Sequence, residues 1–105
     1  MEHGLAIIDA MNVLAGKWRM PIIGIIRHDK LRYTDIQQMI PNITPRMLSK
    51  ELKELELNGI VIRTVKNTIP VKIEYSLSES AKELESILIP LIEWGIRHRA
   101  KQIGK

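Results

Sequence analysis

Apolar residues recur at helical spacing in the first part of the chain. The first such segment, residues 5–14, has apolar side chains three residues apart: Leu5, Ile8 and Met11. Gly16 follows as a helix stop signal. Residues 17–28 are rich in isoleucine around Trp18 and predict a short buried helix, although β-branched residues leave a strand open. We therefore expect two short helices before residue 30.

Two further helical segments follow with a very short connection. Residues 31–40 predict a third helix, with Thr34 as N-cap ahead of Asp35, whose carboxylate suits the positive end of a helix. Pro41 ends this helix. Only residues 41–43 separate it from the next cap, which predicts a helix-turn-helix pair.

The fourth predicted helix has strong signals at both ends. Thr44 can cap it, and Pro45 suits the first helical position. It runs to Asn58, with Gly59 as its terminator. One stripe is apolar: Leu48, Leu52 and Leu55. The outward face is polar and basic, with Arg46, Ser49, Lys50 and Lys53.

After Gly59 the pattern changes to two β-prone runs, residues 60–65 and 71–77, around a polar tip, which predicts a hairpin. Ser78 can cap a final helix, which we expect to be kinked at Pro90. The expected fold class is mainly α with a small β-hairpin, a winged helix-turn-helix with N- and C-terminal dimerisation helices.

This arrangement predicts a DNA-binding surface. The major groove of B-DNA admits one α-helix, and the second helix of such a pair presents its first turns to base edges. Arg46 could bond to guanine, Ser49 to either class of base, and the lysines to phosphate or guanine. The candidate contacts on the helix are Thr44, Pro45, Arg46, Met47, Ser49, Lys50 and Lys53, and those on the hairpin are Arg63, Lys66 and Lys72.

Composition narrows the classes of protein. A chain of 105 residues with 45% hydrophobic residues predicts one domain. The net charge of +4 weakly favours an anionic partner. The longest apolar run, residues 20–26, is too short to cross a bilayer, so we expect no membrane partner and a cytoplasmic location. Without cysteine, thiol sensing and disulfides are excluded.

Several strings resemble the HxlR family of bacterial winged-helix transcription regulators. They are Gly16-Lys17-Trp18, the run from Asn42 to Leu55, Glu74-Tyr75-Ser76-Leu77 and Trp94-Gly95, in family order and spacing. The resemblance covers almost the whole chain. It implies a homodimer that binds operator DNA through the fourth helix and the wing, with the first and last helices in the dimer contact.

On this basis residues 1–105 form one domain, with a DNA-binding core of about 17–77 and dimerisation segments of about 4–15 and 78–103. The expected interface side chains are Leu5, Ile8, Met11, Leu84, Leu88, Leu91, Ile92 and Trp94. A glycine common early in the last helix of the family is replaced by Ala81, which favours a more continuous helix. A small-molecule effector of unknown chemistry could enter between the Trp18 region and the last helix.

Other interpretations stay open at this point. The basic helix face could be ordinary solvated surface, with Lys50 paired to Glu54, or could meet a protein partner without sequence-specific DNA binding. An enzyme is not expected, because no acid and base pair or nucleophile converges. His3, His28 and His98 are too dispersed for a metal site, and no cofactor is expected.

Overall fold

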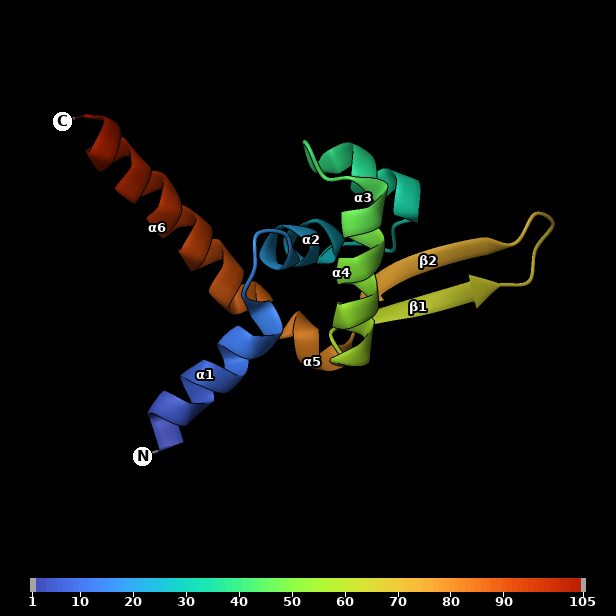
Figure 1. Ribbon diagram of the computed structural model, residues 1–105, viewed down its shortest axis with the longest axis horizontal. Coiled ribbons are helices and arrows are strands. Elements are labelled where there is room, and N and C mark those ends of the chain that lie inside the picture. The colour runs from blue at the N-terminus through green and yellow to red at the C-terminus, as the bar shows by residue number, and fades with distance from the viewer. Residues whose placement is uncertain (1, 105) are drawn as a thin grey trace.

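Three helices and the base of a hairpin form the body of the molecule, and two further helices project from it (Figure 1). A computed structural model describes residues 2–104, with side-chain exposure from residue 4 onward. The elements in chain order are α1 (Glu2–Leu14), α2 (Arg19–Ile26), α3 (Tyr33–Met39), α4 (Pro45–Leu57), β1 (Val61–Lys66), β2 (Lys72–Leu77), α5 (Glu79–Lys82) and α6 (Glu85–Ile103). The expected fold class, mainly α with a small β-hairpin, is confirmed.

The core is formed by side chains from α2, α3 and α4. Those with essentially no exposed surface are Ile22, Ile23, Ile26, Ile36, Leu48, Leu52 and Leu55. α2 is a buried helix, so the strand left open by its isoleucines is excluded. The leucine stripe predicted for α4 faces inward, which fixes the opposite side of this helix toward solvent.

The helix-turn-helix pair begins differently from the prediction. Thr34 is not the cap of α3: Arg32 occupies that position, and its backbone amide donates to Asp35 Oδ2 at 3.1 Å. The carboxylate of Asp35, rather than a threonine hydroxyl, therefore stabilises the start of α3. At α4 the prediction is confirmed, because Thr44 Oγ1 accepts from the amide of Met47 at 3.1 Å and Pro45 is the first helical residue.

The hairpin is tied to the end of α4. β1 and β2 are antiparallel, with Val61 opposite Leu77 at the buried base and Lys66 opposite Lys72 near the tip. Gly59 has φ +73°, a left-handed conformation that glycine adopts without strain. Ser78 Oγ donates to the carbonyl of Gly59 at 2.7 Å. The direction of the wing is therefore coupled to the end of α4.

The C-terminal segment is two helices rather than one. Ser78 caps α5 as predicted, since its Oγ accepts from the amide of Ala81 at 3.1 Å. The chain then turns at residues 83 and 84 before α6 begins, so the continuity expected from Ala81 is wrong. Ala81 itself is buried against the core, which explains a small residue here. α6 continues through Pro90.

α1 and α6 extend away from the body on the side opposite the hairpin and diverge from each other (Figure 1). Neither packs extensively against another element of the described chain. The molecule measures 54 × 38 × 23 Å as a result. Within residues 2–104 no helix has both the length and the apolar composition to span a bilayer.

Candidate nucleic-acid interface

The outward side of α4 carries the polar residues that the sequence predicted there. Arg46, Lys50 and Lys53 are exposed, as are Thr44, Pro45, Met47 and Ser49. They lie opposite the buried leucines of the same helix. The first three turns of α4 therefore present a largely cationic and polar surface to solvent.

These cations are not neutralised by the acidic residues of α4. The ion pairs among the side chains of residues 4–104 join Arg19 to Glu51, Lys66 to Glu74 and Lys82 to Glu79. The expected alternative, a Lys50 to Glu54 pair, is not among them. The charge on the outward face of α4 is therefore available to an anionic partner.

Glu51 points away from that face. Its Oε2 lies 3.5 Å from Arg19 Nε, and both side chains are largely buried. Arg19 Nη1 also donates to the carbonyls of Val13 at 2.9 Å and Asn12 at 3.2 Å, in the last turn of α1. One guanidinium thus joins α1, α2 and α4, a connection that the sequence pattern did not indicate.

The start of α4 has fewer free backbone N–H groups for a phosphate than the sequence pattern suggested. Pro45 has no amide proton, Met47 donates to Thr44 Oγ1, and the amide of Leu48 donates to the carbonyl of Thr44 at 3.0 Å. Within the described residues, only Arg46 of these four positions keeps a free N–H. A phosphate at this helix start would meet that amide.

Tyr33 also lies at the candidate interface, although the sequence pattern did not indicate it. Its hydroxyl donates to the carbonyl of Pro45 at 2.6 Å. Ser49 Oγ lies 3.2 Å from the same hydroxyl. Tyr33 therefore connects the start of α3 to the exposed face of α4. No local signal could reveal this contact, because 12 and 16 residues separate the partners.

The three predicted hairpin cations do not share one face. Side chains alternate between the faces of a hairpin, so Arg63 lies on the same side as Val61 and Tyr75, and Lys66 and Lys72 lie on the other. Arg63 also lines a cleft of about 310 Å³ with Tyr33, Ser49 and Lys53. Arg63 is thus the hairpin cation that lies beside α4.

Lys66 has a partner within the hairpin. Its Nζ lies 3.1 Å from Glu74 Oε1, which offsets part of its charge. Lys72 sits directly opposite Lys66 in the register and is half-buried. The Glu74 side chain is largely buried, so Lys66 is less free than the cations of α4 to turn toward a phosphate.

The side chains expected in the dimer contact are mostly exposed on α1 and α6. Leu5, Ile8 and Met11 are exposed on α1, and Leu91, Ile92 and Trp94 on α6. Leu84 is half-buried against the core. Leu88 is only 3% exposed, because it packs into the core of its own chain, so its assignment to the dimer contact is corrected.

The projecting helices also expose apolar residues that were not expected in the dimer contact: Ile7, Ile87, Ile89, Ile96 and Ile103. Trp18 contributes to the core edge and packs against buried side chains. It therefore acts as a packing residue.

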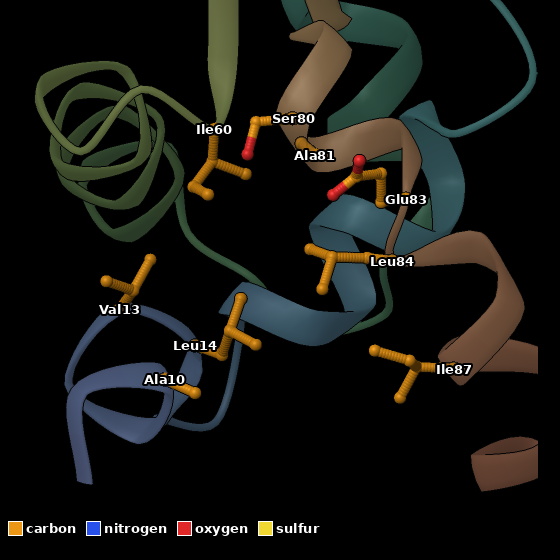
Figure 2. Close-up of a pocket in the computed structure, with 9 residues that line it drawn as sticks. All are labelled: Ala10, Val13, Leu14, Ile60, Ser80, Ala81, Glu83, Leu84 and Ile87. Atoms are coloured by element: carbon orange, nitrogen blue, oxygen red, sulfur yellow. The ribbon is translucent and has the colours of Figure 1, made fainter. Parts of the chain in front are cut away.

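An apolar cleft of about 290 Å³ opens between α1, the start of β1, and α5 and α6 (Figure 2). Its lining comprises Ala10, Val13, Leu14, Ile60, Ser80, Ala81, Glu83, Leu84 and Ile87. Trp18 is not part of it, so the cleft differs in position from the entry expected for an effector. The carboxylate of Glu83 and the hydroxyl of Ser80 are its polar side-chain groups.

Among the side chains of residues 4–104, no group of three or more histidine, aspartate or glutamate residues lies close enough together to hold a metal ion. His98 instead stacks on Trp94, with ring centroids 4.9 Å apart.

A helix-turn-helix pair with an exposed cationic second helix, followed directly by a two-stranded hairpin, defines a winged helix-turn-helix protein. A model of the HxlR-like helix-turn-helix family matches residues 13–103. The chain belongs to this family.

Its relatives are transcriptional regulators. The chain is 38% identical over 103 residues to the uncharacterized HTH-type transcriptional regulator YtcD of Bacillus subtilis, covering 98% of this chain and 82% of YtcD. An uncharacterized HTH-type regulator of Methanothermobacter thermautotrophicus is 39% identical, with 96% and 77% covered. The structure is similar to the reduced form of the redox regulator HypR, with a TM-score of 0.88, 35% identity, and 95% of this chain and 99% of HypR covered.

Proposed function

We propose that this chain is a sequence-specific DNA-binding transcription regulator that acts as a homodimer on a roughly palindromic operator. The observation that carries the proposal is the exposed face of α4, whose cations have no acidic partner within residues 4–104. This face lies next to the hairpin, and its helix is free to enter the major groove of DNA. Membership of a family of transcriptional regulators supports it. No catalytic activity is part of the proposal.

The side chains of α4 have separate roles in this proposal. Arg46 bonds bidentately to guanine, and Lys50 and Lys53 bind phosphate or guanine. Thr44 and the free amide of Arg46 meet a backbone phosphate, with Pro45 and Met47 in van der Waals contact beside them. These contacts supply both the salt-dependent part of the affinity and the base preference.

The hairpin cations contact the flanking backbone or minor groove. Arg63 does so from the face next to α4, and Lys66 and Lys72 do so from the tip. Such contacts raise the affinity for all sequences alike, because phosphates carry no base identity.

The proposed dimer uses α1 and α6. Both helices expose apolar side chains and neither packs extensively against another element, which is expected of a surface that a second copy covers. Residues 4–15 and 78–103 are thus the dimerisation segments, and residues 17–77 the DNA-binding core. Two-fold symmetry then places half-site centres about 34 Å apart, or a multiple of that distance.

The alternative is a winged-helix module that binds a protein partner through the same face of α4. An acidic protein surface could satisfy the cations. It would not need a second copy of the chain at a fixed spacing, and it would not distinguish between base sequences.

A selection from a random duplex library separates the two proposals. We expect repeated rounds of binding to enrich a roughly palindromic sequence, bound at least about 1000-fold more tightly than a scrambled duplex, as is typical of specific regulators. Enrichment of no sequence, together with equal affinity for selected and scrambled duplexes, would favour the protein-binding module.

A small-molecule effector and a cytoplasmic location are the remaining parts of the proposal. The apolar cleft between α1 and α6 offers an effector a volume at the low end of ligand pockets (Figure 2). Thermal unfolding in the presence of candidate apolar metabolites would report its occupation, because a ligand that binds only the folded state raises the melting temperature. An unchanged melting temperature across a broad set of such compounds would count against an effector.

A further inference from the structure

The proton of the Tyr33 hydroxyl has a fixed direction. Tyr33 Oη and the carbonyl oxygen of Pro45 are 2.6 Å apart. A carbonyl oxygen accepts hydrogen bonds and cannot donate them. The single hydroxyl proton of Tyr33 must therefore lie on the bond to Pro45.

The proton of Ser49 is fixed as a consequence. Ser49 Oγ lies 3.2 Å from Tyr33 Oη, and the proton of Tyr33 is already committed. Ser49 must be the donor in this contact. A serine hydroxyl has one proton and two acceptor lone pairs, so only lone pairs remain.

Those lone pairs meet no donor in the described part of the chain. None of the hydrogen bonds among residues 4–104 is accepted by Ser49 Oγ, and the side chain is exposed on the outward face of α4. An incoming partner therefore meets Ser49 as a hydrogen-bond acceptor.

Bases differ in whether their major-groove edge can donate a hydrogen bond to a serine that only accepts one. Adenine and cytosine present amino groups, which donate, whereas thymine and guanine present keto oxygens at the corresponding position, which accept. A free serine hydroxyl can rotate to serve either class. A serine whose proton is held by Tyr33 serves the amino class only.

We propose that Tyr33 is a positioning residue that holds Ser49 as an acceptor, so that the chain selects adenine or cytosine over thymine or guanine at the base that Ser49 faces. This inference rests on the proposed DNA-binding function and narrows it. A Ser49 hydroxyl free to rotate would not discriminate between the amino and the keto bases.

The test compares base preferences at every position of the selected operator for wild type, Ser49→Ala, Tyr33→Phe and Tyr75→Phe. Ser49→Ala identifies the position that Ser49 faces, because the preference there disappears. Tyr33→Phe removes the acceptor that holds the serine proton while keeping the ring. Tyr75→Phe is the matched control, since Tyr75 lines the same cleft but its hydroxyl makes no hydrogen bond within residues 4–104.

We expect wild type and Tyr75→Phe to favour the amino bases by about three- to tenfold, as one hydrogen bond gives. In Tyr33→Phe the four bases should bind within about twofold of one another at that position, with preferences elsewhere unchanged. Loss of packing alone would lower the affinity for all sequences and leave the preference intact.

A base analogue tests the same point on wild-type protein, which avoids any folding defect of Tyr33→Phe. Purine in place of adenine removes the amino group. It should weaken binding by wild type about three- to tenfold, the equivalent of one hydrogen bond, and leave Ser49→Ala unaffected.

An unchanged base profile in Tyr33→Phe would overturn the inference, as would a wild-type preference for thymine or guanine, or a Ser49→Ala variant that alters no position. Absence of any sequence preference in wild type would instead overturn the proposed function, and the inference with it.

Discussion

At the scale of single residues, Arg46 and Lys72 have different expected roles in binding DNA. Arg46 lies in the first turn of α4, where a side chain reaches base edges, whereas Lys72 begins the second strand of the hairpin. We expect Arg46→Ala to cost about 1 to 3 kcal/mol and to relax one base position. Lys72→Ala should weaken all sequences alike and flatten the salt dependence by about one unit.

Titrations of the selected operator and a scrambled duplex at several salt concentrations check both variants. Unchanged operator affinity in Arg46→Ala would remove Arg46 from base reading. A loss confined to the selected operator in Lys72→Ala would contradict its phosphate role.

Local sequence signals determine some residue positions and not others. The cap of α4 follows from Thr44 and Pro45, because both act within one helical turn. The predicted cap of α3 was wrong, because Asp35 at the third helical position bonds back to the amide of Arg32 and leaves Thr34 inside the helix. The contact of Tyr33 with α4 depends on tertiary packing and has no local signal.

At the scale of elements, the turn after α4 directs the wing. Gly59→Ala would keep an open space around the new methyl group but force a left-handed backbone on a residue with a β-carbon. We expect the free energy of unfolding to fall by about 1 to 2 kcal/mol, measured by urea denaturation. Gly24→Ala is the control, since Gly24 lies inside α2 with equally open space.

The control should be stabilised by about 0.5 to 1 kcal/mol, because alanine is the better helix former. Equal effects of the two substitutions would show that the conformation of Gly59 contributes nothing to stability.

Arg19 joins three elements, and its loss should affect all of them. Arg19→Met would leave the largely buried carboxylate of Glu51 without its partner and two carbonyls of α1 without a donor. We expect a loss of about 1 to 3 kcal/mol in the free energy of unfolding. Lys82→Met removes an ion pair whose Glu79 is almost fully exposed, so the expected loss is below about 1 kcal/mol.

A double-mutant cycle with Glu51→Gln isolates the pair. A coupling energy near zero would mean that Arg19 and Glu51 stabilise the fold independently.

Element boundaries were predictable where the period of apolar residues changes. The switch from helix to hairpin at Gly59 is such a place. The break between α5 and α6 was not predictable, because residues 79–88 keep a helical pattern through it. There Ala81 and Leu88 are drawn into the core, and this tertiary demand outweighs local propensity.

At the scale of the whole molecule, the proposed dimer buries apolar side chains of the two projecting helices. Ile8 of α1 and Ile92 of α6 are about half exposed. Ile8→Glu or Ile92→Glu should give a folded monomer at micromolar concentration in analytical ultracentrifugation, because a buried charge opposes association. Leu57→Glu is the control, since Leu57 is exposed at the end of α4, outside both helices.

The control should keep the mass of a dimer. A monomeric wild type would contradict the proposed assembly, and so would a dimer that both glutamate variants leave intact.

The central claim is that the outward cations of α4 bind DNA. Its most direct test is the salt dependence of operator affinity, by fluorescence anisotropy, for wild type and Lys50→Gln/Lys53→Gln. The control is Lys17→Gln/Lys101→Gln, which removes the same charge from exposed positions outside α4 and the hairpin. We predict that the slope of log affinity against log salt flattens by about 0.9 for each phosphate that the α4 variant no longer neutralises, and stays at the wild-type value in the control. Equal slopes and affinities for the two double variants would contradict the claim.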